Sequence, residues 1–162
     1  MKLKILSKEE KEEFLKRVSY LGDLKSEGIF IKTGERIRLF TGSLTEKEIL
    51  KIWNLYMIEG IGLYIAKDFF DRKTKSFETR LSLDGLHFFK NQISDSIIEI
   101  DEEQKEKWFR GESLILKEEQ IKKVKSEIIA LVFKGDFVGS GKIKGDRVYN
   151  YLPKERRVKV SF

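Results

Sequence analysis

The 162-residue chain contains no cysteine, one histidine and one proline. The absence of cysteine excludes disulfides, thiolate-bound zinc, iron–sulfur clusters and cysteine nucleophiles. Because His87 is the single histidine, a histidine-rich metal cage is excluded. A Ser-His-Asp triad is possible only if His87 is its histidine. We therefore expect neither a cofactor nor a bound metal.

Long hydrophobic runs are also absent. The longest uninterrupted apolar run covers residues 128–133, far short of the roughly 20 residues that a membrane-spanning helix needs. The N-terminal sequence MKLKILSKEEKEEF becomes charged before the apolar stretch of a signal peptide can form. We expect a soluble, cytoplasmic protein with no membrane partner.

Charged residues are abundant and unevenly distributed. Lys and Arg number 33 against 27 Asp and Glu, which gives a net charge of +6. Residues 134–159 include eight basic and three acidic side chains, whereas residues 99–106 include five carboxylates and one lysine. A basic surface near the C-terminus is typical of proteins that bind polyanions.

Hydrophobic periodicity predicts helices and hairpins in the first half of the chain. Ser7 and Glu10 form a capping-box pattern at the start of a helix. We expect this helix to end at Gly22, as a C-cap glycine. The further expected elements are a hairpin over 28–40, a helix from Thr45 to Gly60, strands at 62–70 and 75–83, and a short helix at 84–91.

The pattern changes near residue 95, so we expect two domains, 1–95 and 96–162. An acidic run at 101–106 fits either a linker or the start of a helix, and a charged segment at 117–127 is expected to be a helical insert. The expected strands are residues 113–116, 128–133, 137–139, 147–151 and 158–162. Several short strands at close spacing suggest a small barrel.

The segment FKGDFVGSGKIKGDRVYNYLPKERR is the richest in functional signals. It is not a Walker-type phosphate loop, because Asp136 stands where the first glycine belongs and Ile143 follows Lys142 in place of Ser or Thr. We expect a glycine-rich backbone turn in which Gly139 and Gly141 let the chain pass close to a phosphate. The alternative is that the neighbouring cations form an ordinary solvated face.

Aromatic residues alternate with the basic residues of this segment. A base stacked on an exposed aromatic side chain contributes about 1–3 kcal/mol. Tyr149 and Tyr151 are the stacking candidates, and we expect one of them to face outward, whereas Phe133 and Phe137 are expected in the core. The predicted RNA contacts are Arg110, Lys142, Lys144, Arg147, Tyr149, Tyr151, Lys154, Arg156 and Arg157.

Three carboxylates, Asp68, Asp71 and Glu78, flank a predicted strand turn. Carboxylates of this kind could hold Mg²⁺ in a nuclease. Their spacing matches no particular metal motif, so a solvated hairpin end is the default interpretation.

Residues 60–89, followed by EKWFRGESLIL, resemble a ribosome-biogenesis family that joins a pre-PUA α/β domain to a C-terminal PUA domain, the module named after pseudouridine synthases and archaeosine transglycosylases. The Phe109-Arg110-Gly111 step and the VGSGK sequence at 138–142 carry most of the resemblance. Eukaryotic members of the family are nucleolar factors for large-subunit assembly, and archaeal relatives exist. Residues 138–158 also look like the RNA-binding tail of the Nol/Nop/Sun cytosine methyltransferases.

The resemblance implies an α+β fold, with an N-terminal α/β pre-PUA domain followed by a small C-terminal PUA-type pseudo-β-barrel. It implies a non-enzymatic RNA-binding protein that acts in large-subunit assembly or rRNA processing. Its partner would be rRNA or tRNA, and its N-terminal domain would be available to protein partners. The alternative is a stand-alone RNA-targeting subunit for an rRNA or tRNA modification enzyme.

Overall fold

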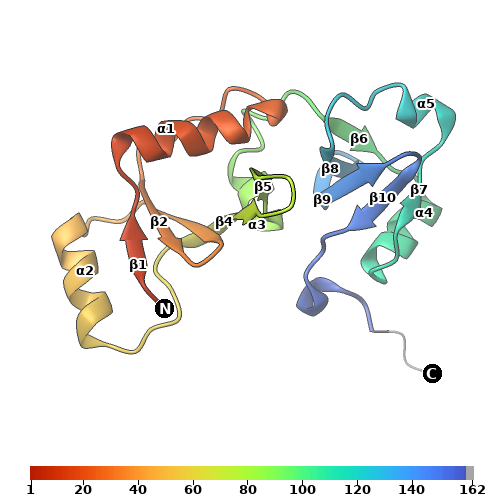
Figure 1. Cartoon of the computed structure of the whole chain (residues 1–162). Coiled ribbons are helices and arrows are strands. Elements are labelled where there is room, and N and C mark those ends of the chain that lie inside the picture. The colour runs from red at the N-terminus through yellow and green to blue at the C-terminus, as the bar shows by residue number, and fades with distance from the viewer. Residues whose placement is uncertain (160–162) are drawn as a thin grey trace. The chain divides into compact units, whose positions relative to one another are not determined.

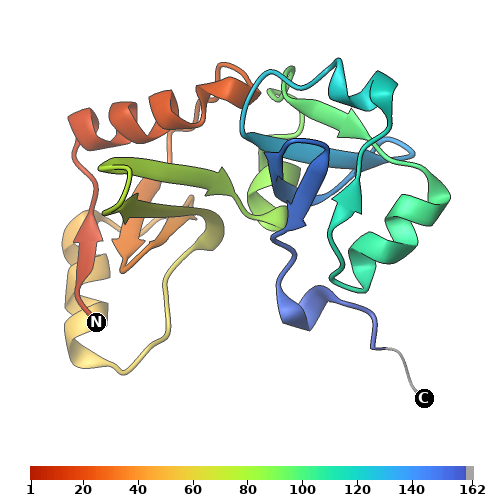
Figure 2. The ribbon, with the colours of Figure 1, turned by 45° about the vertical axis from the view of Figure 1, so that its right-hand side comes forward.

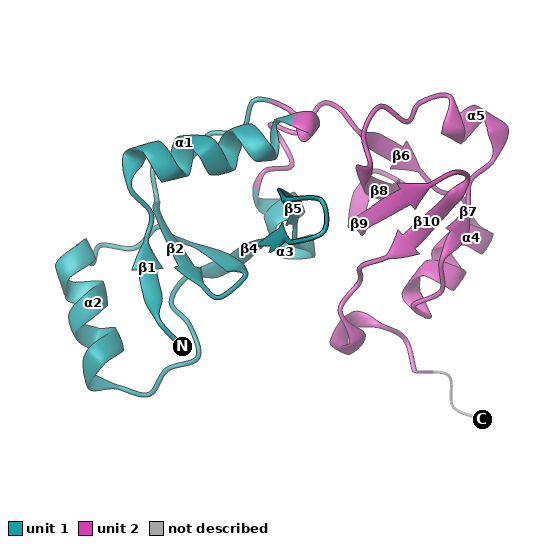
Figure 3. Cartoon of the chain, viewed as in Figure 1, with its two compact units in different colours: residues 1–19, 23–88 teal, residues 20–22, 89–162 magenta. Residues whose placement is uncertain are grey.

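A computed structural model describes residues 1–159 of the chain, which has the mixed α+β composition expected from the sequence (Figure 1). The chain forms two compact units: unit 1 is Met1–Ser19 with Asp23–Phe88, and unit 2 is Tyr20–Gly22 with Phe89–Phe162 (Figure 3). The main division falls between Phe88 and Phe89, ahead of the domain boundary expected between residues 95 and 96. No helix in the described residues is long and apolar enough to cross a membrane.

Unit 1 is built on a five-stranded antiparallel sheet in which each strand pairs with the next along the chain. The expected hairpins form, because alternating apolar residues are interrupted by turn residues at Gly34 and at 72–75. The strands are β1 (Leu3–Ile5), β2 (Ile29–Thr33), β3 (Arg36–Phe40), β4 (Leu63–Asp71) and β5 (Ser76–Leu81).

Three helices accompany this sheet: α1 (Lys8–Arg17), α2 (Glu46–Leu55) and α3 (Leu83–Phe88). The capping box predicted at Ser7 is present, and Thr45, the predicted start of the second helix, forms another with Glu48. The prediction that Gly22 caps the first helix is wrong, since α1 ends at Arg17 with Val18 as its cap and a 3₁₀ turn, η1 (Ser19–Leu21), follows. The second helix likewise ends at Leu55, before Gly60.

The core of unit 1 lies on both sides of β2. Phe14 of α1 packs on Phe30 of β2 with ring centroids 5.7 Å apart. On the other side, Ile49 of α2 is buried with Leu3 and Ile31. Figure 2 shows α1 running along the sheet and α2 beside β1. Helix α2 thus covers the β1 end of the sheet.

Unit 2 contains a second five-stranded sheet, which curls into a half-barrel, in the order β6-β8-β9-β10-β7. Strand β6 pairs with β8 in parallel and the other pairs are antiparallel. Its strands are β6 (Ile97–Glu99), β7 (Leu114–Ile115), β8 (Ile128–Phe133), β9 (Asp136–Lys144) and β10 (Arg147–Asn150). Strand β6 was not predicted, and β9 is longer than the expected strand at 137–139.

The structure decides between the two interpretations of the acidic run, and it corrects the expected helical insert. The acidic run is the first part of helix α4 (Glu102–Phe109), whose N-cap is Asp101. The charged insert at 117–127 is helical only over α5 (Glu118–Ile121). A short 3₁₀ turn, η2 (Lys154–Arg156), follows β10. Residues 158 and 159 are not in a strand, and the rest of the strand expected at 158–162 lies outside the described residues.

Candidate nucleic-acid interface

Strands β9 and β10 bring four of the predicted RNA-contact residues together on one face of the unit 2 sheet. Lys144 lies directly opposite Arg147, and Lys142 lies directly opposite Tyr149. Directly opposite side chains on an antiparallel pair have Cβ atoms about 4.5–5.5 Å apart. Because side chains two residues apart point to the same face, the four form a compact group, which we call the β9–β10 basic face.

The basic face is open to solvent, while the opposite face of the same strands is core. Arg147 and Lys144 are exposed, Tyr149 is 45% exposed, and Val148 between Arg147 and Tyr149 is fully buried. Neither Lys144 nor Arg147 forms an ion pair with another residue in the described part of the chain. Three cations, of which Lys142 is half-buried, thus lie on the same face as one accessible aromatic ring.

Tyr149 and Tyr151 differ in the way that the sequence left open. Tyr149 lies within β10 and faces outward, whereas Tyr151 follows the end of β10 and is half-buried. Tyr149 is therefore the exposed aromatic side chain of the basic face.

The two glycines predicted to make a backbone turn do not make one. Gly139 and Gly141 lie inside β9, and the turns are at Gly135 and Gly145 on either side of this strand. Gly139 has φ +145°, and a Cβ there would lie 3.0 Å from the indole of Trp108. At Gly141 a Cβ would lie 2.3 Å from Val148. Glycine is therefore needed at both positions, because the buried side chains of Trp108 and Val148 occupy the space that a Cβ would fill.

Arg110 and Arg157 are held by neighbouring groups at the end of α4. The Arg110 Nε donates to Glu112 at 3.0 Å, which balances its charge. Arg157 donates from Nε to the Leu152 carbonyl at 3.0 Å, and its side chain lies over Gly111, where a Cβ would meet it at 2.6 Å. Both arginines thus have a structural partner that the sequence did not indicate.

The C-terminal segment after β10 is fastened to α4 by a network around Asn150. The Asn150 Nδ2 donates to the carbonyls of Trp108 at 2.7 Å and Glu112 at 2.9 Å, and its Oδ1 accepts from the Leu152 amide. The amide of Val158 donates to the Phe109 carbonyl at 2.7 Å. This segment displays Lys154 and Arg156, which are both exposed.

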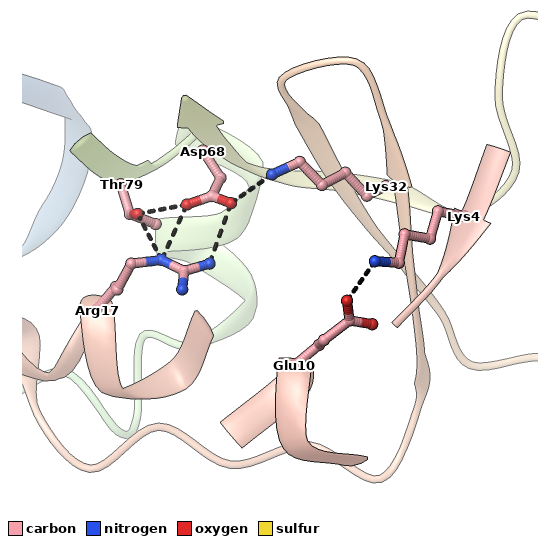
Figure 4. A network of polar contacts seen from close by, with 6 residues as sticks. All are labelled: Lys4, Glu10, Arg17, Lys32, Asp68 and Thr79. Atoms are coloured by element: carbon pink, nitrogen blue, oxygen red, sulfur yellow. Dashed lines mark hydrogen bonds and ion pairs between the residues drawn. The ribbon is translucent and has the colours of Figure 1, made fainter. Parts of the chain in front are cut away.

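The carboxylates considered for a metal-dependent nuclease do not converge. The Asp68 side chain, 1% exposed, accepts two hydrogen bonds of 3.1 Å from Arg17, one of 2.7 Å from Lys32 and one of 2.5 Å from Thr79 (Figure 4). Glu78 lies beside Thr79 on the other face of the sheet and pairs with Arg80 at 2.9 Å. Within residues 1–159, no three His, Asp or Glu side chains are grouped to hold a metal ion.

Asp68 is ionised because its partners outweigh the cost of burial. Burial by itself raises the pKa of the Asp68 carboxyl, whereas hydrogen bonds from Lys32 and Thr79 and the charge of Arg17 lower it. The net effect holds its pKa below the ordinary value of an aspartate. The group is a structural ion pair that joins α1, β2, β4 and β5.

Comparison with known proteins supports the expectation that the C-terminal part of the chain is a PUA-type domain. Residues 95–158 match the family model described as the methyltransferase RsmF PUA domain. This part of the chain is a PUA-type domain. The match covers the curled sheet of the PUA-type domain together with α4 and the segment that follows β10. A search of curated proteins found no match to the chain.

Proposed function

We propose that this protein binds RNA through the β9–β10 basic face of its PUA-type domain. The observation that carries the proposal is that Lys142, Lys144 and Arg147 share one face of the sheet with the exposed ring of Tyr149. Cations attract the phosphates of RNA, and an accessible aromatic ring stacks an unpaired base. A single-stranded or looped segment fits this chemistry best, since the bases of a duplex are not available for stacking.

We infer a non-enzymatic role in ribosome assembly, in which the protein binds rRNA of the large subunit or its precursor. The resemblance of residues 60–89 and 106–116 to the pre-PUA and PUA family supports this role. The second candidate is a stand-alone subunit that brings RNA to a modification enzyme. The match of residues 95–158 to a domain of a methyltransferase family favours this alternative.

RNA affinity of a charge-neutralised variant tests the interface. The triple variant Lys142→Gln, Lys144→Gln, Arg147→Gln should bind a single-stranded oligouridine much more weakly than the unaltered chain. The matched control is Lys8→Gln, Lys47→Gln, Lys51→Gln, which removes three exposed lysines of unit 1 and leaves the basic face intact. Equal losses in the two triple variants would contradict the assignment of the interface.

The assembly role and the targeting-subunit role predict different binding partners in the cell. An assembly factor should sediment with precursors of the large subunit and leave mature ribosomes, whereas a targeting subunit should co-purify with a modification enzyme. Crosslinking in cells, followed by sequencing of the bound RNA, would identify the RNA. Crosslinks confined to tRNA would contradict the assembly role.

A further inference from the structure

The β4–β5 hairpin of unit 1 ends in two exposed phenylalanines. Phe70 and Phe77 lie directly opposite each other across the two strands, with exposed fractions of 51% and 48%. Their ring centroids are 5.3 Å apart, and their planes are inclined at 68°, an edge-to-face arrangement. Each ring therefore fixes the other while leaving about half of its surface in water.

The turn that joins these two strands is basic. Arg72, Lys73 and Lys75 are exposed, and none of their side chains forms an ion pair within the described part of the chain. Asp71 accepts a hydrogen bond of 2.8 Å from the Lys73 amide, which closes the turn. We call Phe70, Phe77 and the three cations the hairpin tip.

The ring of Phe77 contacts two cations that belong to the ion-pair network of Asp68. The guanidinium of Arg17 lies 4.7 Å from the centroid of Phe77, and the ammonium of Lys32 lies 5.4 Å from it. Both cations are anchored on the buried carboxylate of Asp68. The phenylalanine is thus oriented before any ligand arrives, which lowers the entropy cost of binding.

The other aromatic group of this sheet is already covered. Arg36 and Arg38 lie 5.4 and 5.9 Å from the ring centroid of Tyr64, and both Tyr64 and Phe69 are half-buried. Cations that cover the Phe69 ring are paired with glutamates: Lys67 with Glu35, and Arg80 with Glu78. Only the hairpin tip combines exposed rings with cations, Arg72 and Lys75, that lack a carboxylate partner among the described residues of unit 1's sheet. The third cation of the tip, Lys73, interacts electrostatically with Asp71.

We propose that the hairpin tip is a second RNA contact, in which Phe70 and Phe77 stack unpaired bases and the turn cations hold the adjacent phosphates. Single-stranded nucleic acid is recognised by this pairing of aromatic stacking and positive charge. A protein partner fits less well, because the cores of protein interfaces are depleted in lysine. The inference rests on the proposed function only in taking RNA as the ligand.

Photocrosslinking of the full chain to an iodouridine-substituted oligouridine tests the contact. Stacked iodouridine should crosslink to Phe70 or Phe77, identified by mass spectrometry of the tryptic peptides. The double variant Phe70→Leu, Phe77→Leu keeps apolar side chains but loses the aromatic faces, so it should lose these crosslinks. Loss of about 1–3 kcal/mol per stacked base corresponds to a roughly five- to 150-fold rise in Kd. The control Leu55→Ala, Met57→Ala alters two other exposed apolar residues of unit 1.

A charge test separates this inference from the proposed function. The variant Arg72→Gln, Lys73→Gln, Lys75→Gln should weaken binding more than the control Lys8→Gln, Lys47→Gln, Lys51→Gln. If hairpin-tip variants bind normally and no crosslink maps to residues 63–81, the inference is wrong, whatever the basic face does. If the tip variants weaken binding but Lys142, Lys144 and Arg147 do not matter, the inference stands and the proposed interface fails.

Discussion

Trp108 donates its indole N–H to the carbonyl of Val138 at 2.8 Å and packs against the backbone of Gly139. The indole is fully buried, and it joins α4 to the middle of β9. Strand β9 also carries Lys142 and Lys144, so this contact fixes the strand that displays the basic face. The stability of the PUA-type domain and the geometry of its RNA surface therefore depend on the same contact.

Gly139→Ala should destabilise the PUA-type domain by about 1–3 kcal/mol, the usual cost of a strained backbone position. An alanine there must adopt an unfavourable φ, and its Cβ would crowd the indole at 3.0 Å. Urea unfolding followed by the fluorescence of Trp108, in a Trp53→Phe background, measures the change. Gly135→Ala is the control, since Gly135 also has a positive φ but has nothing within 4 Å of the Cβ position. Equal losses at the two positions would rule out a packing role for the indole.

Local features of the fold were predictable from the sequence. The capping boxes at Ser7 and Thr45 and the hairpin at 28–40 depend on residues a few positions apart, so short-range chemistry determines them. Strand β6 was missed because it is short and pairs in parallel with β8, more than thirty residues later along the chain. A single sequence gives no signal for such a pairing.

The site could be predicted only in part, for a related reason. The cluster of basic residues was visible, and strand alternation was enough to place Lys144 beside Arg147 once the hairpin turn at Gly145 was known. The glycines of VGSGK looked like a phosphate-binding turn because the side chains that require them come from other elements: Trp108 of α4 requires Gly139, and Val148 of β10 requires Gly141. The contact of Arg157 with Gly111 also depends on how the C-terminal segment packs at the end of α4, whereas the partner of Arg110, Glu112, lies only two positions away.

Asp68→Asn should destabilise unit 1 in a pH-dependent way. The amide leaves Arg17 and Lys32 without a counter-charge, and because these cations are about a quarter exposed, we expect the lower end of the cost of breaking a buried pair, about 3 kcal/mol. The folded pKa of Asp68 lies below its unfolded value, so the ion pair stabilises fully above about pH 4 and is lost as the pH falls through the folded pKa. The difference in unfolding free energy between the unaltered chain and the variant should therefore shrink in acid. A difference independent of pH would contradict this role.

Tyr149→Leu should weaken binding of single-stranded RNA by about 1–3 kcal/mol, whereas Tyr149→Phe should retain most of the affinity, because stacking depends on the aromatic face. Fluorescence anisotropy with a labelled oligouridine gives both values of Kd. The urea midpoint of Tyr149→Leu should change little, since the ring is 45% exposed. If both variants bind as tightly as the unaltered chain, the hydroxyl and the ring both lie outside the RNA contact; an equal loss in both would implicate the hydroxyl and contradict stacking.

The salt dependence of RNA affinity should separate the cations that contact phosphate from those that hold the fold. On single strands, each phosphate contact contributes about −0.7 to the slope of log K against log salt concentration. Lys144→Gln and Arg147→Gln should each reduce the magnitude of the slope by about this amount, since these side chains are exposed and lack ion-pair partners among the described residues. Arg110→Gln should leave the slope nearly unchanged, because Glu112 already neutralises this arginine.

Arg157→Gln should lower the urea midpoint of the PUA-type domain more than it changes the slope, because its side chain covers Gly111 and binds the Leu152 carbonyl. If Arg110→Gln or Arg157→Gln reduced the magnitude of the slope more than Arg147→Gln did, the RNA surface would lie at the end of α4 and not on the β9–β10 basic face.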